Sequence, residues 1–239
     1  PSVAELERTL AHELLDGLEF PVLCGSATTG VGVDRLLDFI CELGPSPLDR
    51  PVMVAAGNET VDVKADAGGQ PLAYVFKTIA DPFVGQLSLF KVLSGVIRAD
   101  DHLINTSTGA DERLHGLFPL RGKEQLPIKE LRAGDLGAVA KLANTRTGDT
   151  LAPKGTPVKV EPAPVPPAVF GVAIRPKTQA DDDKLAQGLG RLVAEDPTMR
   201  LERNPETNQL VLWCMGEAHV DVLLGDVGID VVHVLDLDR

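Results

Sequence analysis

Cysteines are the first residues of this chain to consider as carriers of chemistry. Cys24, Cys41 and Cys214 are odd in number and widely spaced, and they form no Cys-x-x-Cys pair. Disulfide frameworks and zinc knuckles require paired cysteines. We therefore predict that Cys24 and Cys214 are small buried hydrophobic residues, in a compartment that keeps thiols reduced.

Two polar clusters resemble metal sites in residue type but not in spacing. Glu217 and His219 are two residues apart, so on a helix they point about 200° away from each other and cannot share a metal. Asp181, Asp182 and Asp183 stand at the start of a predicted helix, where the helix dipole favours acidic side chains. The sequence predicts neither a metal ligand nor a catalytic residue.

Phosphate-binding motifs are absent from the sequence. It contains neither a Gly-x-x-x-x-Gly-Lys-Ser/Thr loop, which would cradle phosphates and magnesium, nor an Asn-Lys-x-Asp string, which would recognise guanine. An Asp-x-x-Gly string, Asp66 to Gly69, lies in a glycine-rich stretch and is interpreted as a plain turn. We expect this chain alone to bind no nucleotide and to be inactive as an enzyme.

Charge and composition exclude further classes of partner. The chain of 239 residues carries a net charge of −12 and has one Trp and one Tyr. Neutralising phosphates requires clustered Lys and Arg, so free nucleic acid is not an expected partner. No apolar run approaches the roughly 18 residues that a membrane span needs, and the start at Pro1 lacks the features of a signal peptide.

Residues 1–48 indicate helix, strand, helix. Ser2 and Glu5 form a capping box before a leucine-rich helix, and 20–24 is an apolar run typical of a buried parallel strand. A second amphipathic helix begins near Val33 and ends at a capping Gly44. One strand cannot form a sheet, so this segment is predicted to be the end of a larger α/β domain.

Residues 49–165 predict a β-barrel. Turn signals recur every eight to twelve residues. A proline-rich linker over residues 162–167 crosses the boundary between this domain and the next one, which begins at residue 166. The predicted strands are Leu72–Ile79, Leu87–Leu93, His102–Asn105, Arg113–Leu117, Ile128–Leu131, Leu136–Leu142 and Val158–Val160.

Residues 166–239 predict a ferredoxin-like sandwich with the order β-α-β-β-α-β. The predicted strands are Val169–Ile174, Met199–Arg203, Leu210–Trp213 and Ile229–Val234, and a long helix spans Gln179 to Glu195. The second helix should begin at Glu217 and end after about eight residues, because Gly225 and Gly228 interrupt it. The fold class is therefore multidomain: an α/β remnant, an all-β barrel and an α+β ferredoxin-like sandwich.

Seven motifs resemble those of a known family, and they follow one another in the order that the family has. They are Cys24-Gly25-Ser26-Ala27, Asp81-Pro82-Phe83-Val84-Gly85, Ser94-Gly95-Val96, Arg132-Ala133-Gly134-Asp135, Thr147-Gly148-Asp149-Thr150-Leu151, Pro176-Lys177-Thr178 and Met215-Gly216-Glu217-Ala218-His219-Val220-Asp221. Together they resemble elongation factor G-like translational GTPases over roughly residues 3 to 232. The resemblance identifies the end of the GTP-binding domain, then domain II, then domain III.

The resemblance implies a site, a cofactor and partners. Ser26 and Ala27 are the residues expected to contact guanine, through the backbone N–H groups beside them. The parent protein, meaning a whole protein of this family, would use GTP and magnesium. It would act as a cytoplasmic monomer on the small ribosomal subunit. Because Ala218 and Val220 replace leucines of the common pattern, a paralogue of the housekeeping factor is favoured.

Two other interpretations are retained. A ribosomal protection factor of the tetracycline-resistance type shares all three regions. A non-catalytic ribosome-binding regulatory module, which has lost its nucleotide site, would be a different class of protein. A phosphate-binding loop upstream of Pro1 would exclude this second alternative.

Overall fold

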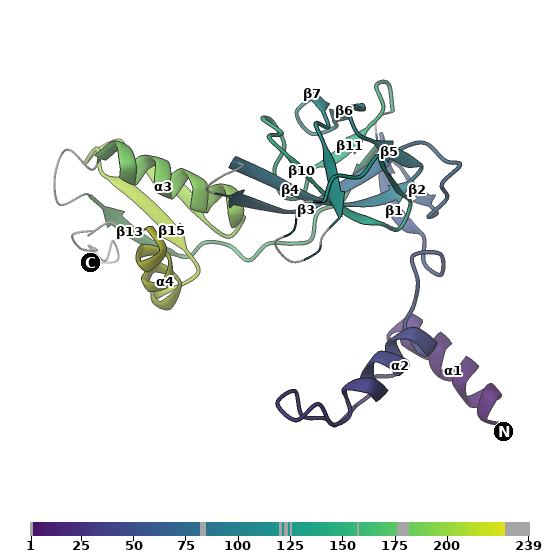
Figure 1. The fold of residues 1–239 in the computed structure, drawn as a ribbon. Coiled ribbons are helices and arrows are strands. Elements are labelled where there is room, and N and C mark those ends of the chain that lie inside the picture. Colours follow the sequence, from purple (N-terminus) through teal and green to yellow (C-terminus); the bar gives the residue numbers. More distant parts are fainter. Residues whose placement is uncertain are drawn as a thin grey trace.

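The computed structural model describes residues 2–81, 85–119, 121, 124, 126–156, 158–175 and 182–227. Figure 1 shows three bodies along the chain: a pair of helices, a β-barrel, and a smaller body of helices on a sheet. The helical pair stands away from the barrel at the end of a single connecting segment, and the smaller body lies on the other side (Figure 1). The mixed architecture predicted from the sequence is confirmed.

The N-terminal body consists of helices α1 (Val3–Asp16) and α2 (Val33–Leu43). The predicted capping box is present: Glu5 N–H donates to Ser2 Oγ at 3.3 Å, and Ser2 N–H donates to Glu5 Oε2 at 2.7 Å. The α1 helix ends at Gly17 in the left-handed region, with φ 72°. This end of the helix follows from local sequence alone.

The buried strand predicted at Phe20–Cys24 is wrong. These residues have no strand assignment, and Phe20 and Val22 are 79% and 90% exposed. A strand of a parallel sheet is stabilised by neighbours on both edges and by helices on both faces. None of the described residues supplies such neighbours, so the apolar run has nothing to pair with.

Helix α2 ends at the predicted capping Gly44. Gly44 N–H caps the helix by donating to Ile40 O at 3.0 Å, but Gly44 is extended, with φ −66°, and not left-handed. A Cβ at Gly44 would lie 2.4 Å from Ile40 O, so close approach is what requires glycine here. Leu36, Leu37 and Ile40 of α2 are exposed, because the described residues do not cover them.

The barrel is built from antiparallel strands in three sheets. The largest has the order β7-β6-β11-β3-β4-β10-β8, a second has β12-β1-β2, and β5 pairs with β9. Their bounds are β1 Val52–Ala56, β2 Glu59–Val63, β3 Leu72–Asp81, β4 Gly85–Ser94, β5 Val96–Arg98, β6 His102–Asn105, β7 Asp111–Arg113, β8 Leu117–Pro119, β9 Glu130–Arg132, β10 Leu136–Ala140, β11 Thr150–Ala152 and β12 Val158–Val160.

The sequence located most of these strands but not all. The single strand predicted over Arg113–Leu117 is two, because β7 ends at Arg113 and the chain turns at Gly116, with φ 69°, before β8. Strands β1, β2, β5 and β11 were not predicted; the last two have only three residues each, too few to show a period.

The interior of the barrel is apolar and contains a buried polar network at one end. Its fully buried members include Val75, Phe90 and Leu117. Nearby, the buried Glu112 accepts hydrogen bonds from Asn144 N–H and from the Thr145 hydroxyl at 2.7 and 2.9 Å. Burying a carboxylate is costly unless donors surround it, so these bonds hold the loop that contains residues 144 and 145 against β7.

The third body is a sheet covered by two helices. Strands β13 (Phe170–Ile174), β15 (Leu210–Cys214) and β14 (Arg200–Arg203) pair in that order, and α3 (Asp182–Glu195) and α4 (Glu217–Val227) complete the body. One core holds them together; among its buried side chains are Val172, Leu185, Leu189, Leu212, Cys214, Val220 and Leu223. The predicted order therefore holds over the described residues.

The second helix of the third body is longer than predicted. The second helix is eleven residues long and runs through Gly225 to Val227, so the short helix predicted to stop near Leu224 is wrong. A single glycine costs a helix only roughly 1 kcal/mol, so Gly225 by itself does not end it. The predicted strand Ile229–Val234 and the predicted cap at Thr178 lie outside the described residues.

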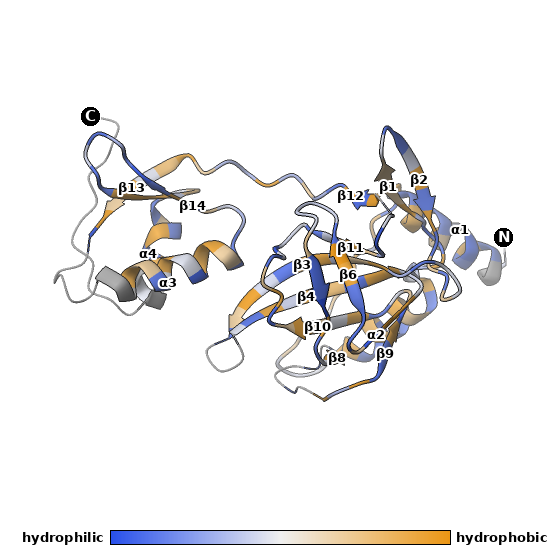
Figure 2. Cartoon of the chain, turned by 90° about the horizontal axis from the view of Figure 1, so that it is seen from above, coloured by the Kyte–Doolittle hydropathy of each residue, from blue (hydrophilic) through white to orange (hydrophobic). Residues whose placement is uncertain are grey.

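The segment between β12 and β13 is extended and lacks regular secondary structure. Residues 161–167 are exposed, as the proline content predicts for a linker. Figure 2 shows this segment as a long connection between the barrel and the third body. Across the described part of the chain, no helix is long and apolar enough to span a membrane.

Candidate functional site

A tight loop between residue 24 and the start of α2 contains the predicted guanine contacts. Ser26 N–H donates to Val31 O at 2.9 Å, and Gly30 N–H donates to Ser26 O at 2.9 Å. The Ser26 hydroxyl accepts from Thr29 N–H at 3.3 Å, so the side chain braces its own loop. Ser26 is half-buried and Ala27 is exposed beside it.

Two glycines allow this loop to close on itself. A Cβ at Gly25 would lie 2.9 Å from Val31 O, and one at Gly32 would lie 2.6 Å from Cys24 O. Gly32 also has φ 75°, a conformation that side chains other than glycine rarely adopt. The loop is therefore shaped by its own backbone, with Ser26 bonded across its base to Val31.

The cysteines differ in environment. Cys214 is buried, as predicted, and burial together with the nearby Asp196 carboxylate raises the pKa of its thiol to about 11. Cys24 is exposed, so its predicted burial is wrong. It lies on the unpaired segment before the loop, where the described residues provide no sheet to bury it.

Among the remaining sequence candidates, Asp66 has a structural role. Asp66 forms a turn in which its carboxylate accepts Gly68 N–H at 2.8 Å and its carbonyl accepts Gly69 N–H at 3.1 Å, as predicted. The described residues contain no group of three His, Cys, Asp or Glu that could hold a metal. Asp181 lies outside the described residues, as do the side chains of its two acidic neighbours.

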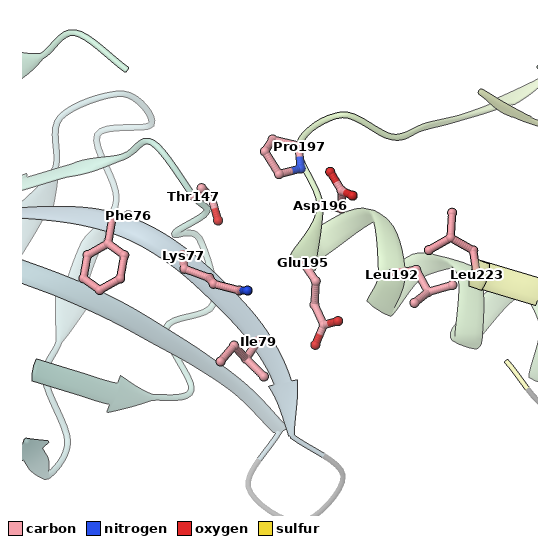
Figure 3. Close-up of a pocket in the computed structure, with 9 residues that line it drawn as sticks. All are labelled: Phe76, Lys77, Ile79, Thr147, Leu192, Glu195, Asp196, Pro197 and Leu223. Carbon is pink, nitrogen blue, oxygen red and sulfur yellow. The ribbon is translucent and has the colours of Figure 1, made fainter. Parts of the chain in front are cut away.

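A hollow at the joint between the barrel and the third body was not predicted. It has a volume of about 540 Å³, and Figure 3 shows side chains of β3 on one wall and those of α3 on the opposite wall. Its lining comprises Phe76, Lys77, Ile79, Thr147, Leu192, Glu195, Asp196, Pro197 and Leu223. These residues come from distant parts of the sequence, so no local motif could have indicated the hollow.

One hydrogen bond connects the two walls, and others organise the α3 side. Glu195 Oε1, at the end of α3, accepts the backbone N–H of Ala80 in β3. The next residue, Asp196, lies 3.2 Å through Oδ2 from His219 Nε2 and accepts from the backbone and hydroxyl of Thr198 at 2.8 and 2.6 Å. His219, which the sequence did not predict to bind a metal, therefore connects the start of α4 to the end of α3.

Comparisons with known proteins agree with this geometry. Residues 70–154 match the family model described as Elongation factor G domain 2, and residues 165–228 match that described as Elongation Factor G, domain III. The chain belongs to the elongation factor G family, of which it carries domains II and III.

Relatives extend the match beyond these two domains. The elongation factor G-like proteins of two Mycobacterium tuberculosis strains, CDC 1551 / Oshkosh and ATCC 25618 / H37Rv, are each 40% identical to it over 242 residues, covering 93% of this chain. A crystal structure of a Thermus thermophilus protein superposes with a TM-score of 0.77 at 30% identity, covering 98% of this chain and 34% of that one. The chain spans 33% of the length of the curated relatives it matches.

Proposed function

We propose that this chain is the middle portion of a translation factor that acts on the ribosome in the cytoplasm and is driven by GTP in the parent protein. The observation that supports the proposal is the order of three bodies: the N-terminal helices with the Ser26 loop between them, then domain II, then domain III. Each body is joined to the next in the sequence order that the family has.

A relay explains why such an order is useful. Loss of a γ-phosphate changes only local contacts in a nucleotide domain, so stiff neighbouring bodies must convert it into a larger movement. The barrel and the third domain have separate cores, and an extended linker runs between them. Two such bodies can reorient as units, with the barrel serving to dock on the small subunit.

The nucleotide would be held largely by other parts of the parent protein. In this chain, Ser26 and Ala27 would present backbone N–H groups to the guanine carbonyl oxygen, on a loop that the Ser26 hydroxyl already holds in shape. A phosphate-binding loop elsewhere in the parent would supply the contacts to magnesium and phosphate. We expect the factor to act as a monomer.

Sedimentation with purified ribosomal subunits tests the ribosomal role. The chain should pellet with small subunits and not with large ones. Its net charge of −12 opposes non-specific contact with ribosomal RNA, so specific binding should change little between low and moderate salt. Equal recovery with both subunits, or recovery that disappears at moderate salt, would count against the proposal.

A further inference from the structure

Strand β3 has an open edge where the barrel meets the third domain. β11 pairs with β3 at Ala73 and Tyr74, and loop residues 148 and 149 bond to Val75. Among the described residues, no strand continues this edge from there to the end of β3. Backbone groups on an open edge need acceptors from elsewhere, and Ala80 N–H finds one in the Glu195 carboxylate.

Glu195 lies where a local rule disfavours an acidic side chain. It is the last residue of α3, whose final turn contains no basic residue, and the negative end of the helix dipole repels a carboxylate there. Residues that break a local rule often serve a function of the tertiary structure. The bond to the partly buried Ala80 is charge-assisted, which makes it stronger than a bond between neutral groups.

The backbone next to Glu195 is held rigid within the third domain. Asp196 N–H donates to Leu192 O at 3.0 Å, and the Asp196 carboxylate binds Thr198 and pairs with His219 of α4. A movement of Glu195 therefore carries α3 and α4 with it. The bond to Ala80 joins one rigid domain to the other.

We propose that Glu195 is a latch that holds the third domain in one orientation against the barrel. With the latch closed, Glu195 covers the open edge of β3, and the hollow lies between Lys77 and Ile79 on one wall and Leu192 on the other (Figure 3). When the latch opens, the covalent connection through residues 161–169 remains, and the third domain pivots on it. The consequence for a relay depends on the proposed function, but the latch itself does not.

Hydrogen exchange and a distance measurement on this chain, without ribosomes, test the latch. In Glu195→Ala, the Ala80 amide should exchange about tenfold faster, the effect expected from losing a charge-assisted bond. The Val75 amide, bonded to Asp149 O at 2.9 Å within the barrel, should be unchanged and is the internal control. For the distance measurement, spin labels are attached at Ser107→Cys on the barrel and Arg191→Cys on α3, with Cys24 and Cys41 replaced by serine. The distribution of distances between the two labels should be broader in Glu195→Ala than with Glu195 present.

Two variants separate the latch from a general loss of structure. Glu206→Ala, in the exposed turn between β14 and β15, removes a glutamate from the same domain and should behave as wild type. Glu195→Gln keeps an oxygen that accepts from Ala80, so it should restore most of the protection and the narrow distribution.

Three outcomes would overturn the proposal. The first is unchanged Ala80 exchange in Glu195→Ala, and the second is faster exchange with an unchanged distance distribution. The third is a Glu195→Gln variant as open as Glu195→Ala, which would show that charge and not the hydrogen bond holds the domains. Failure of ribosome binding would leave all three measurements unaffected, so the two proposals fail separately.

Discussion

The N-terminal helices and the third domain have similar sequence patterns but different burial. Helix α2 and helix α3 each carry one apolar stripe, yet α2 has no buried residue whereas Leu185 and Leu189 of α3 are 1% and 0% exposed. The difference is a sheet: β13, β14 and β15 lie under α3, and no described strand lies under α2. A periodic pattern therefore specifies a helix and its apolar face, while burial depends on a neighbour.

Leucine truncation should show the largest difference between the two regions. Leu189→Ala should lower the free energy of unfolding of the third domain by about 2–5 kcal/mol, because it removes a fully buried side chain and leaves a cavity. Leu37→Ala in α2, where the leucine is 57% exposed, should change the free energy of unfolding of the N-terminal helices by less than about 0.5 kcal/mol. Denaturation of each variant is followed by circular dichroism, which reports on all helices, and by Trp213 fluorescence, which reports on the third domain alone, since the chain has one Trp. Equal effects would mean that α2 is also packed.

A buried carboxylate in the barrel should give the next largest effect. Glu112→Ala should destabilise the barrel by about 1.5–3 kcal/mol, since Asn144 N–H and the Thr145 hydroxyl lose a charged acceptor. The control Glu59→Ala, at an exposed position of β2, should lie within about 0.5 kcal/mol of wild type. Calorimetry on both variants measures the difference. A neutral Glu112→Ala would show that the network does not stabilise this loop.

The buried Cys214 should make the stability of the third domain depend on pH. Burial raises the pKa of Cys214 to about 11 from the ordinary 9.0, so the folded state resists losing this proton. The stability due to the neutral thiol is full below pH 9 and is lost as pH rises from about 9 through 11, because the unfolded thiol ionises first. Urea midpoints at pH 8 and 10 should therefore differ more in the wild type than in Cys214→Ala.

Thiol labelling at neutral pH provides the matched measurement. The exposed Cys24 and Cys41 should react with a maleimide quickly, and Cys214 should react only after unfolding. Rapid modification of all three cysteines would contradict the assigned burial.

The smallest expected effect is in nucleotide binding, where we expect this chain to show no binding. Titrating this chain with a fluorescent guanine nucleotide should give a flat response, because the sequence contains no phosphate-binding loop and no Asn-Lys-x-Asp string. The variant Gly32→Val, which would disrupt the loop by clashing with Cys24 O, should give the same flat response. A saturable signal in the wild type that the variant abolishes would show that the loop binds guanine unaided.

Much of the fold and part of the candidate site could be predicted because their causes are local. The capping box at Ser2, the turn at Asp66 and the order of elements in the third domain depend on neighbours in the sequence. The loop at Ser26 depends on hydrogen bonds among residues 26–31, so the motif already indicated it. Its role in binding guanine remains a prediction.

The amino-acid sequence by itself determined where helices, turns and most strands form, because propensity, period and capping act over a few residues. Tertiary structure alone decided that Phe20–Cys24 lacks a sheet and that Cys24 is exposed. It also brought Glu195 to Ala80, across 115 positions of sequence. Such contacts depend on how separate bodies meet in space, and no local pattern encodes that meeting.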